Sequence, residues 1–237
     1  MAYQPLFAGK TVLVTGCGQE LSEATVRMLA QRGADGVLIG GRAVEQGQAV
    51  AAIVSAAGCE AYFQPTDLTK LEDCVALIAK ADDAFGRLDA VIFSAGMAAP
   101  RGHPESPEEQ LDHLHAVNVR APFCLMLRAA ELMHRAGRPG SMINVLGLPG
   151  DDDLLPFAAY QAAQSGLASL TLCLAEAWAQ EGIRVLGLDA SAAFSGRTEA
   201  RAALLTVTGA IARLATDPGA AASGAVVAVD RLLPATA

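Results

Sequence analysis

Short apolar runs alternate with helical patterns along almost the whole chain, and this alternation limits the fold more than any other feature. Strands are predicted at 11–15, 36–40, 61–64, 90–94, 141–146, 184–188 and 224–229. Helices are predicted at 21–31, 44–57, 71–85, 107–136 and 157–180, and the fourth is expected to bend near Pro122, which lacks a backbone donor. Strands that alternate with helices in this way predict a doubly wound α/β fold, with a parallel sheet of about seven strands and helices on both faces.

Length and charge narrow the class of protein further. The 237 residues suit one domain spanning 1–237 better than two half-sized ones. The net charge of -8 would repel phosphate backbones and anionic lipid, so we expect neither nucleic acid nor membrane surfaces as partners. The five cysteines form no C-x-x-C pair, and residues 1–10 do not resemble a secretory signal. We therefore expect a cytoplasmic protein.

Loop carboxylates and histidines are the candidate metal ligands. Residues 147–156 are predicted to form a loop, and it contains the consecutive residues Asp151, Asp152 and Asp153. Three neighbours in a loop cannot easily converge on one ion. His113 and His115 are two positions apart and diverge on a helix. We assign no metal.

Eight segments resemble, in register, motifs of the short-chain dehydrogenase/reductase (SDR) family. They are TVLVTG at 11–16, TDL at 66–68, FGRLD at 85–89 leading to SAG at 94–96, VNV at 117–119, SMIN at 141–144, Tyr160, GIRV at 182–185 and the stretch 223–230. Together they cover nearly the whole chain. The resemblance implies a Rossmann-like dinucleotide-binding fold and oxidoreductase chemistry.

The first turn departs from the family pattern, in which T-G-x-x-x-G-x-G lets backbone N–H groups approach a pyrophosphate. Thr15, Gly16 and Gly18 are present, but Glu20 and Ser22 occupy the second and third glycine positions. A carboxylate roughly 5 Å from a phosphate charge costs about 3 kcal/mol, or about a hundredfold in affinity, at an effective dielectric near 20. We therefore expect no dinucleotide binding or weak binding. The alternative is a different flexible turn at 16–18 with Glu20 pointing outward.

Other cofactor positions favour NADP over NAD if a dinucleotide binds at all. Arg42 follows the second strand, where an acidic residue would hold the ribose of NAD, and its guanidinium suits a 2′-phosphate. The alternative is a solvated arginine at a strand end. The resemblance assigns Asp67 to adenine, and Ala95 and Gly96 to backbone contact with the cofactor. These residues could equally be relics of the fold.

The catalytic set of the family is Asn, Ser, Tyr and Lys, with the serine thirteen residues before the tyrosine and the lysine four after it. Counting from Tyr160 places Gly147 at the serine position and Gln164 at the lysine position, while Asn118 matches the asparagine. Without the lysine ammonium, only about one tyrosine in a thousand is ionised at neutral pH. Tyr160 and Asn118 are therefore residual catalytic candidates in an impaired site, and structural roles are the alternative for both.

The substrate lid is also altered. Where the family has Pro-Gly and then a helical flap, this chain has Ala190 and Ser191, followed by a shortened segment near 192–210. A short lid would weaken both water exclusion and substrate positioning.

Three functions are compatible with these residues. The first is a non-catalytic subunit, resembling the degenerate partner chains of heteromeric SDR dehydrogenases, that forms a homo-oligomer or pairs with an intact SDR chain. The second is an active NADP(H)-dependent oxidoreductase that uses Tyr160 in an unusual site. The third is a dinucleotide or metabolite sensor. The uncharged helix at 157–175 is expected to need a partner, because otherwise Leu167, Leu170, Leu174 and Trp178 would be left in water.

Overall fold

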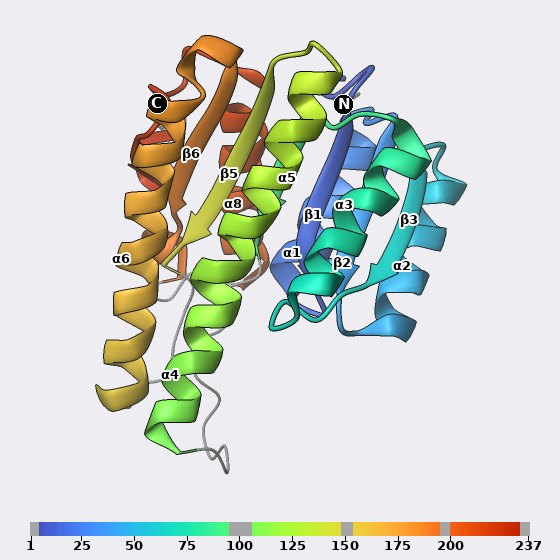
Figure 1. The fold of residues 1–237 in the computed structure, drawn as a ribbon. Coiled ribbons are helices and arrows are strands. Elements are labelled where there is room, and N and C mark those ends of the chain that lie inside the picture. The colour runs from blue at the N-terminus through green and yellow to red at the C-terminus, as the bar shows by residue number, and fades with distance from the viewer. Residues whose placement is uncertain (1–4, 95–105, 148–153, 195–199, 233–237) are drawn as a thin grey trace.

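A seven-stranded parallel sheet forms the centre of the molecule (Figure 1), in a computed structural model that describes residues 5–94, 106–147, 154–194 and 200–232. The strand order is β3-β2-β1-β4-β5-β6-β7. The strands are β1 (Thr11–Cys17), β2 (Gly36–Gly41), β3 (Glu60–Pro65), β4 (Ala90–Phe93), β5 (Gly140–Leu146), β6 (Ile183–Asp189) and β7 (Val226–Ala228). The predicted doubly wound fold is confirmed, and each predicted strand is present.

Helices cover both faces of this sheet (Figure 1). They are α1 (Glu20–Gln31), α2 (Val44–Ala56), α3 (Leu71–Phe85), α4 (Pro107–His115), α5 (Ala121–Arg135), α6 (Leu154–Ala177), α7 (Ser191–Phe194) and α8 (Ala200–Thr216). Three short segments are also helical: η1 (Ala116–Arg120), η2 (Ala179–Glu181) and η3 (Val229–Leu232). One apolar cluster joins the sheet to α1, α2 and α8, and a second joins it to α3, α5 and α6. In the described ranges, no helix combines the length and the apolar character needed to cross a membrane.

The central strands are apolar on both sides because both of their faces are covered. In β1, Val12 and Val14 pack into the first cluster, while Leu13 between them packs into the second. Successive side chains of a strand point to opposite faces, so a strand between two helical layers needs apolar residues at every position. This requirement produces the short apolar runs in the sequence.

The predicted helix at 107–136 is divided into three parts, which differs from the expected bend at Pro122. The π-helical segment η1 separates α4 from α5, and Pro122 lies in the first turn of α5. Proline cannot donate to the carbonyl four residues earlier, which here belongs to Asn118, so the regular pattern is interrupted one turn before the proline. The interruption places Asn118 in an irregular turn.

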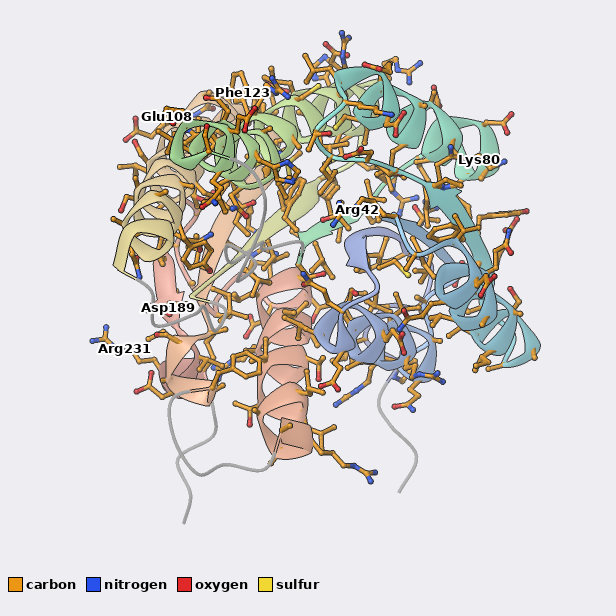
Figure 2. The ribbon with its side chains drawn as sticks, turned by 90° about the horizontal axis from the view of Figure 1, so that it is seen from below. Arg42, Lys80, Glu108, Phe123, Asp189 and Arg231 are labelled. Atoms are coloured by element: carbon orange, nitrogen blue, oxygen red, sulfur yellow. The ribbon has the colours of Figure 1, made fainter. Side chains whose placement is uncertain are left out.

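All strands run in the same direction, so their carboxyl ends meet at one edge of the sheet. In doubly wound folds ligands bind outside this edge. Figure 2 looks onto it and shows Arg42, which follows β2, and Asp189, the last residue of β6. The candidate site is therefore sought in the turns that follow the strands.

Candidate functional site

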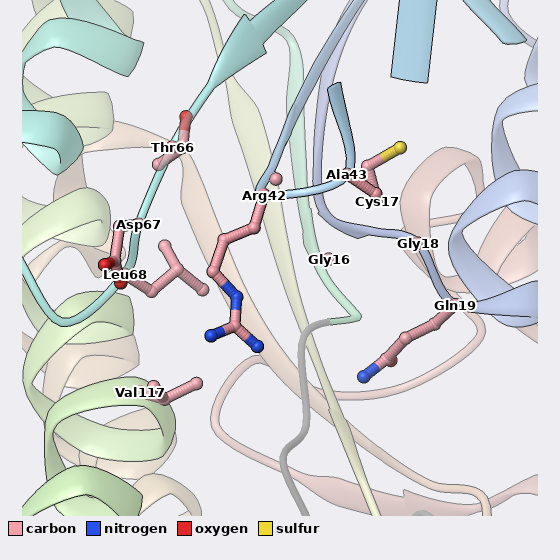
Figure 3. Close-up of a pocket in the computed structure, with 11 residues that line it drawn as sticks. Gly16, Cys17, Gly18, Gln19, Arg42, Ala43, Thr66, Asp67, Leu68 and Val117 are labelled. Atoms are coloured by element: carbon pink, nitrogen blue, oxygen red, sulfur yellow. The ribbon is translucent and has the colours of Figure 1, made fainter. Parts of the chain in front are cut away.

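A cavity of about 340 Å³ opens at the carboxyl ends of β1, β2 and β3. Figure 3 shows side chains approaching it from both sides, with Leu68 and Val117 on one side of Arg42 and Gln19 on the other. The residues that line the cavity are Gly16, Cys17, Gly18, Gln19, Gly41, Arg42, Ala43, Thr66, Asp67, Leu68 and Val117. The cavity thus contains four of the predicted cofactor residues, Gly16, Gly18, Arg42 and Asp67.

A serine closes the turn between β1 and α1. Gly16 and Gly18 both have positive φ angles, 95° and 103°, which glycine adopts without steric cost. The Ser22 side chain is 1% exposed, and its hydroxyl donates to the carbonyls of Gly16 at 2.6 Å and Gln19 at 2.8 Å. Ser22 therefore stabilises the turn by hydrogen bonding to its backbone, at a position where the family has a glycine.

Glu20 lies outside the cavity, contrary to our expectation. It is the first residue of α1, its side chain is exposed, and it is not among the residues that line the cavity. An acidic residue in the first turn of a helix is favourable because it faces the positive end of the helix dipole. The electrostatic objection to a bound phosphate assumed that the carboxylate faces the ligand. The alternative, a flexible turn with Glu20 directed outward, agrees with the structure.

Arg42 and Asp67 both line the cavity, and Figure 3 shows Arg42 extending between the side that carries Asp67 and the side that carries Gln19. The Asp67 carboxylate accepts hydrogen bonds from the backbone N–H of Thr69 at 3.0 Å and from its hydroxyl at 2.8 Å. Partial burial acts to raise the pKa of Asp67, but these two bonds and the charges of Arg42 and Lys70 lower it overall. Asp67 therefore fixes the loop after β3, and Arg42 is the cationic side chain of the cavity wall.

Sequence reasoning missed several lining residues, of which Cys17, Gln19, Thr66 and Val117 are the clearest. Cys17 and Gln19 flank Gly18, and Thr66 precedes Asp67. For Cys17, Gln19 and Thr66 the available signal was their position at or just after the end of a strand, because every turn at the carboxyl edge is a candidate lining segment. Val117 lies in η1, and no such signal marked it. Thr15, by contrast, is buried just before the cavity, and its carbonyl accepts a hydrogen bond from the Ser94 hydroxyl at 2.6 Å. Ala95 and Gly96 lie outside the described residues, as do Asp151, Asp152 and Asp153.

Comparison with known proteins agrees with this geometry. The family model for short chain dehydrogenases matches residues 10–201. The chain belongs to the short-chain dehydrogenase family. An uncharacterized oxidoreductase of Thermotoga maritima is 34% identical over 179 residues, which cover 76% of this chain and 70% of the relative. The cis-4-hydroxycyclohexanecarboxylate dehydrogenase of Sinomonas cyclohexanicum is 31% identical over 94% of this chain and 96% of its own.

A solved structure of the same family has a closely similar fold. It is a metagenomic short-chain oxidoreductase in complex with NADP, with a TM-score of 0.77 and 30% sequence identity. The alignment covers 94% of this chain and 98% of that one. An SDR-type Rossmann fold and membership of an oxidoreductase family are therefore shown for this chain.

The residues that counting from Tyr160 assigns to the family's catalytic positions lie directly after β5, in the N-terminal half of α6 and in η1. Tyr160 and Gln164 are one helical turn apart on α6 and are 3% and 8% exposed. Asn118 lies in η1, which packs against α6, and it is 1% exposed. Gly147 follows β5 directly, and its backbone N–H donates to Oε1 of Gln164 at 3.2 Å. A neutral hydrogen bond therefore joins the two residues predicted to take the serine and lysine positions.

The backbone conformation and the neighbours of Gly147 are unfavourable for a serine at this position. Its φ angle is 69°, a left-handed conformation that is unfavourable for residues with a Cβ atom. A Cβ added there would lie 2.5 Å from Oδ1 of Asp189 and 3.0 Å from both Cβ and N of Ser191. The turn after β6 thus fills the space that a serine side chain would need.

The region of the expected short lid is only partly described. After β6 the chain forms the four-residue helix α7, and α8 begins at Ala200. Ala190 donates its N–H to the carbonyl of Leu146 at 2.9 Å, which keeps this turn against the end of β5. The length and role of the lid remain predictions. Within the described ranges, His, Cys, Asp and Glu side chains form no cluster of three that could hold a metal ion.

The apolar residues of α6 mostly face the chain's own core, which corrects the expectation that they need a partner. Leu167, Leu174 and Trp178 are buried in this single chain, and Leu170 packs partly against the same cluster. From residue 158 onward, where the burial of α6 is described, the large apolar side chain that it exposes is Leu172, at 50%. On the neighbouring α5, Phe123 and Leu127 are also exposed. An oligomer stays a prediction, and these three side chains are its candidate contacts.

Proposed function

We propose that this chain is an NADP(H)-binding member of the SDR family that lacks the family's proton-transfer set and serves as a non-catalytic subunit beside an intact SDR chain. The observation that carries the proposal is the hydrogen bond from the Gly147 N–H to Oε1 of Gln164. It supports the assignment of an uncharged amide to the lysine position and of a residue without a side chain to the serine position.

The residues of the cavity fit a dinucleotide with a 2′-phosphate. Gly16 and Gly18 open the turn, and Ser22 closes it without entering the cavity. Arg42 supplies a guanidinium at the end of β2, where charge-assisted hydrogen bonds to phosphate oxygens are strong. The NADP complex of the similar metagenomic oxidoreductase supports the same choice. When bound, NADPH would supply a hydride.

The side chains around Tyr160 do not favour proton transfer. An ammonium group near a tyrosine stabilises the phenolate, whereas the Gln164 amide carries no charge and its oxygen is already an acceptor for Gly147. Loss of a serine hydroxyl also removes a donor to a developing oxyanion, which typically costs about a hundredfold or more in rate. With both groups replaced, turnover by the family's usual route is expected to be negligible.

An active NADP(H)-dependent oxidoreductase is the second candidate. It is favoured by Tyr160, which is buried on α6, the helix that packs against η1, and by a dehydrogenase relative that aligns over 94% of this chain. A dinucleotide sensor would share the binding step and would need neither turnover nor a partner chain.

Two measurements on the purified full-length chain separate these functions. Calorimetric titration with NADPH and NADH tests binding, and consumption of NADPH with a panel of ketones and aldehydes tests turnover. We expect NADPH to bind more tightly than NADH, with no turnover. Robust NADPH oxidation would establish the second candidate, and failure of both dinucleotides to bind would reject the proposed cofactor. Co-purification with an intact SDR chain would separate the subunit from the sensor.

A further inference from the structure

Two of the five cysteines lie on neighbouring helices that pack against each other. Cys74 is in α3 and Cys124 is in α5, on the same face of the sheet (Figure 1). Cys74 is fully buried in the apolar cluster of this face, and Cys124 is partly buried and packs against the same cluster. The other two buried cysteines, Cys17 and Cys59, belong to the cluster on the opposite face. Cys74 and Cys124 are therefore the two thiols that the fold brings into one cluster.

Two hydrogen bonds fix the register of α3 against α5. Just before the helices begin, the Arg120 guanidinium donates to the Thr69 carbonyl at 2.7 Å, and near their ends Arg135 donates to the Asp82 carboxylate at 2.7 Å. The bonded residues are 51 positions apart in the first pair and 53 in the second, and the two cysteines are 50 apart. Since a helix rises about 1.5 Å per residue, the cysteines are level to within about one turn.

Both cysteines lie on the helix faces that meet between α3 and α5. A groove of about 630 Å³ opens there, and Ile78 and Arg128 line it from the two helices. Cys74 is one turn before Ile78 and Cys124 is one turn before Arg128, so each shares a helix face with a groove residue. Packed helices have axes about 8–10 Å apart and Cα radii of about 2.3 Å. Facing Cα atoms can therefore come within about 4–6 Å, a separation that a disulfide spans.

The surroundings of the two thiols suit different steps of an oxidation. Burial raises the pKa of the Cys74 thiol to about 11, and charge on Cys124 is the next contribution to the rise, so the two sulfurs interact electrostatically. Cys74 therefore stays protonated and covered, whereas Cys124 is partly exposed and is the thiol that a soluble oxidant reaches first. An accessible cysteine beside a second cysteine that can resolve it is a common arrangement in redox-sensitive sites.

We propose that Cys74 and Cys124 form a redox-active pair whose oxidant is a hydroperoxide. The Cys124 thiolate attacks one oxygen of hydrogen peroxide, the O–O bond breaks, and the hydroxide that leaves becomes water by taking up the proton that Cys124 had lost. The Cys74 sulfur then attacks the sulfenic sulfur of Cys124, and the Cys74 proton leaves with the hydroxyl group as a second water. Two thiols are oxidised to one disulfide, and the peroxide is reduced to water.

The disulfide would join α3 to α5 near the dinucleotide cavity. The segment before α3 carries Leu68 and the segment before α5 carries Val117, and both residues line the cavity. Oxidation would therefore fix two segments of the cavity wall relative to each other. The inference goes beyond the proposed function, because it requires neither a dinucleotide nor a partner chain.

Peptide mapping of the full-length protein tests the pair. The chain is treated with hydrogen peroxide, the remaining thiols are blocked with iodoacetamide, and trypsin digestion follows without reductant. Cleavage after lysine and arginine releases Cys74 in peptide 71–80 and Cys124 in peptide 121–128, so their linked product has a distinct mass. We expect it to be the main disulfide and to disappear with dithiothreitol. Oxidation in urea is the reference, and there the preference for this pair should be lost.

Variants assign the product to the two cysteines. Cys124→Ser should abolish the linked peptide, while Cys173→Ser, which removes an exposed cysteine of α6, is the matched control and should leave it unchanged. Peroxide should also raise the midpoint of thermal unfolding of the wild-type chain and of Cys173→Ser, because a disulfide constrains the unfolded chain, but not that of Cys124→Ser. Oxidation of the native chain without a link between Cys74 and Cys124, or a rise in the midpoint that persists in Cys124→Ser, would overturn the proposal.

Discussion

The backbone N–H of Gly147 donates a hydrogen bond to Oε1 of Gln164 across 3.2 Å. Counting from Tyr160 predicts that these residues take two catalytic positions of the SDR family, and here the Gln164 side-chain oxygen satisfies the Gly147 N–H. A buried or half-buried N–H that loses its acceptor costs about 1–3 kcal/mol. Replacement of either residue alone therefore disturbs an existing contact in addition to supplying a new functional group.

Gln164→Lys should leave NADPH oxidation with general carbonyl substrates undetectable. The ammonium cannot accept the Gly147 N–H, and the serine position still has no side chain, so the catalytic set stays incomplete. The midpoint of thermal unfolding should also fall, by an amount equivalent to about 1 kcal/mol. Gln161→Lys is the control, because it makes the same change at an exposed position of α6. Robust carbonyl reduction by Gln164→Lys would mean that the site was nearly intact.

Gly147→Ala should destabilise the chain more than Gly86→Ala. Both glycines have positive φ angles, 69° and 64°, so both substitutions carry about 1 kcal/mol of backbone cost. A Cβ at residue 86 would have nothing within 4 Å, whereas at residue 147 it would contact Asp189. Urea unfolding should show an additional loss of about 1–3 kcal/mol for Gly147→Ala. Equal losses for the two variants would indicate that the turn after β6 moves away freely.

Arg42→Ala should weaken NADPH binding by about tenfold or more and change NADH binding little, because the guanidinium would contact the 2′-phosphate that NADH lacks.

Glu20→Gln should change the affinity for NADPH by less than about threefold, since the Glu20 side chain lies outside the cavity. Both effects are measured by calorimetry at one fixed salt concentration. A gain approaching a hundredfold in Glu20→Gln would show that the carboxylate does face the phosphate.

Self-association, or pairing with another SDR chain, should depend on the exposed apolar side chains of α5 and α6. Leu127→Asp and Leu172→Asp place a charge at positions that are 39% and 50% exposed in the single chain. Because these side chains make few contacts within the chain, monomer stability should be nearly unchanged while the oligomer dissociates. Light scattering measures the mass. A stable wild-type monomer at high micromolar concentration would argue strongly against the subunit function.

Cysteine reactivity should follow burial. Burial is the main cause that raises the pKa of the Cys59 and Cys74 thiols from 9.0 to about 11, so both stay protonated at pH 8 and react slowly. Cys173 is exposed and should be alkylated by iodoacetamide first, as peptide mass spectrometry can determine. The neutral thiols stabilise the fold below pH 9, and this contribution is lost as the pH rises toward about 11. Early alkylation of Cys74 would contradict its burial.

The sheet could be predicted from the sequence because strands covered on both faces carry consecutive apolar residues, as Val12, Leu13 and Val14 do in β1. The interruption at η1 could not be predicted. Pro122 signals a missing backbone donor, but the sequence does not show which turn of the helix becomes irregular. Motif counting located Gly147 and Gln164, but a position in a motif does not give the direction of a side chain. Glu20 illustrates this limit: its place in the first turn was correct, and its expected orientation was not.

The crowded surroundings of Gly147 also constrain how such a site can evolve. A chain that regained serine at this position would carry a strained residue pressed against the Asp189 carboxylate, and would be less stable before it gained any activity. The turn after β6 would have to change first. If residue 147 takes the family's serine position, as proposed, the order in which substitutions accumulate would matter as much as their number, because the turn after β6 must change before a serine at 147 is tolerated.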